Sequence, residues 1–320
     1  MDISVLIPAY NASNYLPDAL ASIERQTRLP DQVIIVDDGS SDGTFECATA
    51  WAENSTLNAL VIKKENGGVS TARNAALERC GTALAAFMDS DDLLMPEHLE
   101  TLQRPFDKDP GLAFAFGDQQ EFNEAADYEN TFHTGKAFLD CPYEERENFR
   151  HLTADVFPYL AVGNFISTSA SMVRMSAVKS SGPFDVTLPT AEDREFFLRL
   201  SRQGGVAYTR RVLARKRMHD SSLTEAVGDL NVVRNGLLLL ANVVANPDRY
   251  AIGPQIVSVC RDLIRQDARG LIHGSSHYGF KSMNADVAWV LETTGLRITP
   301  SIPERLRALY RGIVRFPGAS

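Results

Sequence analysis

The first 120 residues alternate between short apolar runs and segments with helical periodicity, and this alternation restricts the fold more than any other feature. Between the first two runs, Leu16, Leu20 and Ile23 recur at the spacing of one helix face. Strands that alternate with helices predict an α/β fold with a doubly wound, mostly parallel sheet flanked by helices. Ligands of such sheets bind at the carboxyl ends of the strands. The runs expected to form strands are 3–7, 33–36, 60–62, 84–88 and 112–116.

The rest of the chain divides into an irregular stretch and a helical end. Residues 118–160 are polar and aromatic without clear periodicity, so we interpret them as long connections over a site. From residue 227 onward the pattern is helical. We therefore expect an α/β domain over 1–225 and a small helical C-terminal module over 226–320. Helices beyond the first are expected from about 45, over 70–79 and 193–202, and over 227–245, 254–270, 284–294 and 303–316.

Composition narrows the functional class. Apolar residues make up 44% and charged residues 23% of 320, which is ordinary for a globular protein. The formal net charge of -9 argues against a basic surface for nucleic acid. No basic segment precedes the first strand, so no secretory signal is predicted. The apolar run 237–244 is too short to cross a bilayer, so no transmembrane helix is predicted. The four cysteines are widely spaced without a CxxC pair, which favours a reducing, cytoplasmic location.

Acidic residues cluster at the ends of two predicted strands. The sequence DDGS at 37–40 follows the run 33–36, and DSDD at 89–92 follows the run 84–88. If the two strands are parallel neighbours, both clusters lie at one edge of the sheet, where like charges raise each other's pKa. A divalent cation relieves this repulsion, and Mg²⁺ or Mn²⁺ commonly bridges one or two carboxylates to substrate phosphates. The alternative for either cluster alone is a turn that ends a strand and caps the next helix.

Six segments in a fixed order carry more information than either acidic cluster. The segments are PAYN at 8–11, DDGSSDGT at 37–44, NGGVSTARN at 66–74, FMDSDD at 87–92, Glu192-Asp193, and RMHDSS at 217–222. Together they resemble family 2 glycosyltransferases, which have the GT-A fold. The resemblance covers about residues 1–225 and does not extend to 226–320. It implies an inverting enzyme that moves a sugar from a nucleotide-diphosphate donor to an acceptor hydroxyl.

The resemblance also implies a donor site at the strand ends. Asp38 could accept a hydrogen bond from a ring N–H of the base, and Arg73 would contact the base edge or the diphosphate. Asp89 is expected near the ribose. The simpler alternatives are a strand-end turn for Asp38 and a surface helix arginine for Arg73. The residues expected to bind the nucleotide sugar are Pro8, Ala9, Tyr10, Asn11, Asp38, Asn66, Gly67, Arg73, Asp89, Ser90 and Glu192.

The same resemblance assigns the catalytic and metal-binding residues. An inverting transfer needs one carboxylate to take the proton of the attacking hydroxyl, and Asp193 is the expected general base. The alternative role of Asp193 is structural, because the helix dipole favours an acidic residue at a helix N-terminus. Asp91 is the leading ligand for Mn²⁺ or Mg²⁺, with Asp92 as the alternative in the DSDD run. His219 is a further candidate, because neutral imidazole suits Mn²⁺.

Absent motifs exclude other enzyme classes. No GxGxxG follows the first strand and no GxxxxGK[ST] occurs, which argues against a dinucleotide oxidoreductase and a P-loop NTPase. The resemblance implies a glycosyltransferase that uses a UDP-sugar and a saccharide or lipid-linked acceptor in cell-surface polysaccharide or glycolipid synthesis. A nucleotide-sugar-binding scaffold without turnover is the alternative.

The C-terminal end is basic and amphipathic. Residues 297–320 hold five arginines and one glutamate, a net charge of +4, so the remainder carries -13. On a helical wheel, arginines 307, 311 and 315 lie opposite an apolar face. Such a helix docks on the protein body, docks on a partner subunit in a homo-oligomer, or binds the inner face of a membrane. The apolar face consists of Ile302, Leu306, Leu309, Tyr310, Ile313 and Phe316.

Overall fold

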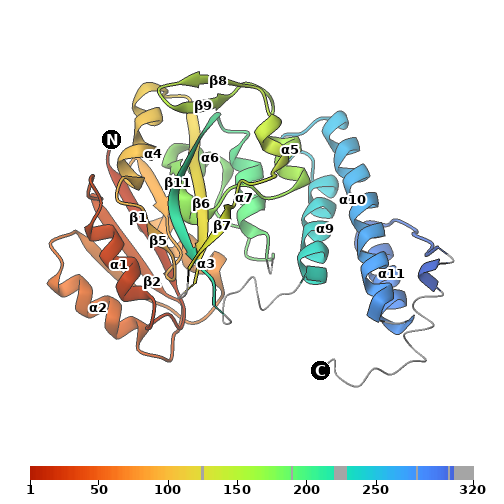
Figure 1. The fold of residues 1–320 in the computed structure, drawn as a ribbon, viewed down its shortest axis with the longest axis horizontal. Helices are drawn as coiled ribbons and strands as arrows, with labels where there is room; N and C mark the ends of the chain where they lie inside the picture. The colour runs from red at the N-terminus through yellow and green to blue at the C-terminus, as the bar shows by residue number, and fades with distance from the viewer. Residues whose placement is uncertain (124–125, 189, 220–228, 279, 302, 306–320) are drawn as a thin grey trace. The chain divides into compact units, whose positions relative to one another are not determined.

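The chain folds into two units in the computed structural model (Figure 1). The first unit comprises 1–187 and 192–220, and the second comprises 188–191 and 221–320. The predicted domain boundary at residue 225 lies outside the described residues. The structure describes residues 1–123, 126–188, 190–219, 229–278, 280–301 and 303–305.

Four parallel strands form one half of the sheet in the first unit. Their order is β3-β2-β1-β4, so β2 and β4 lie on either side of β1. Three of them, β1, β2 and β4, are almost wholly buried, which explains their continuous apolar sequences. Because β2 and β4 run in the same direction, the acidic residues that follow them lie at one edge, as predicted. The strands are β1 (Ile3–Ala9), β2 (Gln32–Asp37), β3 (Ala59–Lys63) and β4 (Leu84–Phe87).

The other half of the sheet is mixed. Strand β10 runs antiparallel between β4 and β6, and β11 pairs in parallel with β6. Strands β9 and β8 continue the sheet beyond β11, while β5 pairs with β11 and β7 with β6. These strands are β5 (Leu93–Leu94), β6 (Leu112–Phe122), β7 (Asp127–Thr131), β8 (Tyr143–Arg146), β9 (Phe149–Leu152), β10 (Ser171–Arg174) and β11 (Gly205–Arg217).

The interpretation of 118–160 as connections is wrong for much of that stretch. Strand β6 continues to Phe122, and β7, β8 and β9 follow within the same range. Strand β8 is exposed throughout and β7 nearly so, so their sequences lack the apolar alternation of a half-buried strand. The missing alternation therefore concealed paired strands as well as loops.

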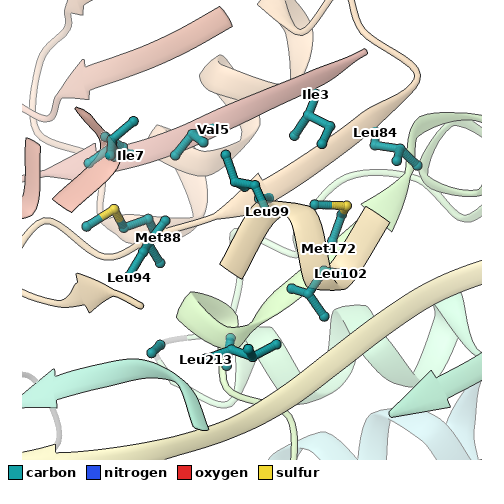
Figure 2. Packing of buried hydrophobic residues seen from close by; sticks show 14 of the residues in the cluster. Ile3, Val5, Ile7, Leu84, Met88, Leu94, Leu99, Leu102, Met172 and Leu213 are labelled. Carbon is teal, nitrogen blue, oxygen red and sulfur yellow. The ribbon is translucent and has the colours of Figure 1, made fainter. Parts of the chain in front are cut away.

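Helices cover the sheet through apolar faces that the sequence shows. In α1 the predicted face of Leu16, Leu20 and Ile23 is buried. Figure 2 shows side chains of β1 and β4 packed against Leu99 and Leu102 of α4 in the main core. The helices of this unit are α1 (Leu16–Glu24), α2 (Thr44–Asn54), α3 (Val69–Arg79), α4 (His98–Lys108), α5 (Phe157–Val162), α6 (Met175–Ser181) and α7 (Glu192–Leu200), with 3₁₀ turns η1 (Ala137–Asp140) and η2 (Thr168–Ala170).

The second unit is helical, as predicted. It contains α9 (Asp229–Ala245), α10 (Pro254–Ser275), η3 (Ser276–Tyr278) and α11 (Phe280–Thr294). Helix α10 begins at a proline, which suits a first helical turn, and runs five residues beyond its predicted end. The predicted helix 303–316 lies outside the described residues except at 303–305. No helix in the described part of the chain has the length and apolar character needed to cross a bilayer.

Candidate active site

Asp38, directly after β2, holds the loop that leads into α3. Its Oδ1 lies 2.5 Å from Nζ of Lys64, and its carboxylate accepts the N–H groups of Gly67 at 3.1 Å and Gly68 at 2.7 Å. The side chain is almost completely buried. The carboxylate expected to contact a base thus also fixes the glycine loop of the predicted donor site.

The end of β1 is tied to the loop that follows β2. Asn11 has a φ of 47°, its N–H donates to Oγ of Ser40 at 2.9 Å, and its Oδ1 accepts the N–H of Ser41 at 2.9 Å. Ala9 and its neighbour Pro8 are buried in the strand, whereas Tyr10 is 54% exposed. Tyr10 therefore offers an exposed aromatic ring to a ligand, and Asn11 is exposed as well.

Arg73 of α3 joins the end of β4 to the start of α7. Its Nη1 donates to Oε1 of Glu192 and its Nη2 to Oδ1 of Asp89, both at 2.8 Å. Although burial alone would lower the pKa of Arg73, Asp89 and Glu192 raise it above its ordinary value. The residue is 4% exposed, so the alternative of a surface arginine is wrong. Three predicted residues thus meet in one buried ion-pair network.

Asp89 occupies the open side of this network. Its Oδ2 accepts from Oγ1 of Thr168 at 3.2 Å, and its N–H donates to Oγ of Ser169 at 3.0 Å. About a third of the side chain is exposed, and the following Ser90 is buried. Asp89 is therefore rigidly held and still accessible to a ligand hydroxyl.

Asp193 stands at the beginning of α7 beside the same network. Its Oδ1 accepts the N–H of Arg194 at 2.6 Å, and its Oδ2 accepts from Nδ2 of Asn164 at 2.7 Å. Burial and, after it, the charge of Glu192 raise the pKa of Asp193 to about 6, against the opposing effect of Arg73. A carboxylate with this pKa can accept a proton near neutral pH. The apolar residues behind it, Phe196, Phe197 and Leu200, are fully buried as expected.

Asp91 and His219 form a separate pair at the same edge of the sheet. Oδ2 of Asp91 lies 3.0 Å from Nε2 of His219, whose ring stacks on Tyr15 at 4.4 Å. Asp92 is instead buried and accepts the N–H of Arg217 at 3.2 Å. The geometry favours Asp91 over Asp92 as the metal ligand.

The pair suits a cation that shares its coordination with a substrate. Burial and then the charge of Asp89 raise the pKa of Asp91, while burial and then Asp91 raise the pKa of Asp92 well above its usual range. Within the described ranges, no three His, Cys, Asp or Glu side chains gather as a complete metal site. A carboxylate and an imidazole close to two further carboxylates, Asp89 and Asp92, match Mn²⁺ or Mg²⁺, ions that complete their coordination shells with phosphate and water.

Lys64, Asn164 and Thr168 contact predicted residues but were not themselves predicted. Lys64 follows β3 directly, and the rule that ligands lie at the carboxyl ends of parallel strands could have found it. Asn164 lies in an irregular segment. Thr168 lies in the 3₁₀ turn η2, directly before β10, which runs antiparallel to β4. Neither position has a sequence signal that distinguishes it from an ordinary loop.

Comparison with known proteins gives a family match and several relatives. The family model described as "Glycosyl transferase family 2" matches residues 4–180, more than half of the chain. A putative glycosyltransferase, EpsH of Bacillus subtilis, is 27% identical over 224 residues, covering 70% of this chain and 62% of EpsH. Glycosyltransferase GlyA of Streptococcus pneumoniae is 31% identical over 150 residues, covering 47% of this chain but only 21% of GlyA. The chain thus spans less than two thirds of these curated relatives.

Solved structures show the same fold at low sequence identity. The structure of residues 1–349 of S. aureus TarS in complex with UDP-GlcNAc superposes with a TM-score of 0.66 at 16% identity, covering 92% of this chain and 82% of that one. The mannosyltransferase PcManGT from Pyrobaculum calidifontis, in complex with GDP-Man and Mn²⁺, gives a TM-score of 0.55 at 15% identity over 97% and 83%. The predicted GT-A fold with a helical C-terminal region is confirmed.

Proposed function

The chain belongs to glycosyl transferase family 2, and on that premise we propose that it moves a sugar from a UDP-sugar to an acceptor hydroxyl with inversion. The observation that carries the proposal is Asp193, a partly buried carboxylate with a pKa of about 6 beside the network of Arg73, Asp89 and Glu192. The choice of UDP is supported by the TarS structures, which bind UDP and UDP-GlcNAc.

The donor would lie along the edge formed by the strand ends. The exposed ring of Tyr10 can stack on the base, and the glycines of the loop at 66–68, which Asp38 fixes, let the backbone approach the donor closely. Asp89 can accept hydrogen bonds from ribose hydroxyls while Arg73 holds it in place. These side chains orient the donor before the reaction and do not need to move during it.

The chemical step is a single displacement at the anomeric carbon. The acceptor oxygen forms the new bond to that carbon as the bond to the diphosphate oxygen breaks, and the hydroxyl proton passes to Asp193. Inversion follows because attack and departure occur on opposite faces of the sugar. Glu192 is held by Arg73, which leaves Asp193 as the carboxylate available for the proton.

Asp91 and His219 would hold Mn²⁺ or Mg²⁺ together with the donor phosphates. The cation, when bound, would neutralise negative charge on the departing diphosphate. Support comes from the donor set of the pair and from PcManGT, which binds Mn²⁺ with GDP-Man.

We further propose that residues 1–225 carry the transfer site and that 226–320 serve another role. The basic segment 297–320 would contact the inner face of a membrane and bring the enzyme to a saccharide or lipid-linked acceptor. Family members in polysaccharide synthesis, such as the putative teichuronic acid biosynthesis glycosyltransferase TuaG of Bacillus subtilis, support such an acceptor. Association into a homo-oligomer through the same segment is the competing hypothesis.

A transfer assay tests the proposal. The full chain is incubated with Mn²⁺, a panel of UDP-, GDP- and dTDP-sugars and saccharide or lipid-linked acceptors, and nucleotide release and product configuration are measured. We expect transfer from a UDP-sugar that stops on chelation, returns with Mn²⁺ or Mg²⁺, and falls about 10²- to 10⁴-fold in Asp193→Asn.

The outcomes separate enzyme from scaffold. If wild type binds a nucleotide sugar but releases no nucleotide with any acceptor, the chain is a binding scaffold. If Asp193→Asn transfers at a near-normal rate, another group is the base. A product with retained configuration would exclude inversion.

A further inference from the structure

The segment between α5 and η2 places one amide side chain directly on the proposed base. Nδ2 of Asn164 donates to Oδ2 of Asp193 at 2.7 Å. Oδ1 of Asn164 accepts the N–H of Ile166 at 3.0 Å, within a turn of its own segment. Because the oxygen is engaged with a backbone donor, the NH₂ group is the end of the amide that faces the carboxylate.

Asn164 is itself held from two sides. Nζ of Lys136 donates to the backbone oxygen of Asn164 at 3.2 Å. Nε of Arg194, the neighbour of the base on α7, donates to the backbone oxygen of Leu160 in α5 at 2.6 Å. Helix α7 thus anchors the segment that contains Asn164, and this segment holds the Asp193 carboxylate in the first turn of α7. The distance between Asn164 and Asp193 is therefore fixed by contacts to the backbone on both sides.

The charged surroundings of Asp193 explain what a neutral donor adds. Glu192 on the same helix and Asp89 after β4 both disfavour the charged carboxylate. Arg73 of α3 favours it, but its guanidinium is paired with those two acids. Lys136 reaches the backbone of Asn164 and so faces the base only through that residue. An amide N–H stabilises the charged form without becoming a competing acid or base.

We propose that Asn164 is the positioning residue of the base: it holds the Asp193 carboxylate in one orientation and keeps it in the charged form. The proposal rests on the proposed function, because only a transfer reaction needs a base there. It assigns a role to a residue outside the six segments on which the resemblance rests, through the hydrogen bond that this residue makes with Asp193.

Asn164→Ala removes the amide donor, whereas Asn164→Asp keeps the oxygen that accepts from Ile166 and replaces the donor with a second carboxylate, whose like charge raises the pKa of Asp193 further. Two measurements follow Asp193: the acidic limb of the transfer rate between pH 5 and 9, and the carboxyl ¹³C titration assigned by comparison with Asp193→Asn. In wild type both are expected near the pKa of about 6. In Asn164→Ala both should move upward by about one pH unit, and in Asn164→Asp they should move further.

The transfer rate of these variants should fall by an amount that depends on pH. At pH 8 the base is still largely charged in Asn164→Ala, so a fall of about tenfold in this variant measures the lost orientation of the carboxylate. At pH 5.5 the higher pKa leaves only about a tenth of the charged base that wild type has, so the total fall is about a hundredfold.

Asn58→Ala is the matched control, because Asn58 is exposed and precedes β3 at the opposite edge of the sheet. It should leave both measurements unchanged. If the variants at 164 fold and lose rate equally at every pH, with the carboxyl titration unmoved, Asn164 only packs the loop and the proposal is wrong. If wild type shows no transfer but its carboxyl titration shifts in the variants, the proposed function fails while the electrostatic role of Asn164 stands.

Discussion

At the scale of single residues, Arg73 has the largest effect on the organisation of the site. It is 4% exposed and bridges two carboxylates from separate elements. Its guanidinium also lies over the ring of Phe184, which stacks on Phe196 of α7 at 4.1 Å. The same side chain therefore joins α3 to α7 by charge and by packing.

Replacing Arg73 with methionine should destabilise the protein. The variant keeps most of the buried volume but leaves Glu192 buried without its partner, which costs about 3 kcal/mol. Asp89 is partly solvated, so its lost pair adds little. Urea unfolding of Arg73→Met against wild type measures the change. Arg79→Met, an exposed arginine on the same helix, is the control and should stay within about 0.5 kcal/mol of wild type. Equal losses in the two variants would mean that the network contributes nothing to stability.

The same residue shows how far sequence reasoning reaches. The motif around Arg73 predicts that it belongs to the site, and the structure brings it to Asp89 and Glu192. Its partners could not be predicted, because 119 residues separate it from Glu192 and only the folded sheet brings them together. Asn164 is the harder case, since its role depends on one hydrogen bond to a residue 29 positions away.

At the scale of elements, the loop after β2 fits tightly against the loop before α3. Gly39 has a φ of 77°, and a Cβ added there would lie 2.7 Å from the backbone nitrogen of Asn66. The backbone of Asn66 cannot move away from an added Cβ as the end of a flexible side chain could. Both the conformation and the close approach therefore require glycine at this position.

Gly39→Ala should cost about 1–3 kcal/mol, from the left-handed backbone and the displaced loop. Because the 66–68 loop is part of the proposed donor site, affinity for the nucleotide sugar should fall as well. Thermal unfolding and donor titration measure the two effects. Gly81→Ala is the control, since a Cβ there meets nothing within 4 Å and its backbone is not left-handed, so both values should be near wild type. A Gly39→Ala variant as stable as the control would show that the loop shifts freely.

Elements differ in how well their sequences predict them. The parallel strands and α1 were predictable because each has one continuous or one-sided apolar pattern. Strand β11 was missed because its pairing with β6 contains register shifts and its sequence carries five arginine and lysine residues. Bulges break the period of two, and exposed cations conceal the buried positions between them.

At the scale of the whole molecule, charge is unevenly distributed along the chain. The net charge is -9, yet residues 297–320 carry +4. An acidic protein is repelled by an anionic membrane as a whole, so attraction must come from a local basic segment. Each arginine close to an anionic surface contributes about 1 kcal/mol, and an apolar helix face adds to this.

Vesicle co-sedimentation of the full chain distinguishes membrane contact from docking on protein. We expect binding to vesicles that contain phosphatidylglycerol, weak binding to neutral vesicles, and release by salt, because the attraction is electrostatic. Substitution of Arg307, Arg311 and Arg315 by glutamate should abolish sedimentation, whereas substitution of the same three residues by lysine keeps the charge and should retain it. The glutamate variant should still transfer sugar to a soluble acceptor, because the residues proposed for the transfer site lie within 1–225. Equal sedimentation of wild type and the glutamate variant would exclude the membrane role and leave a protein surface as the site where this segment docks.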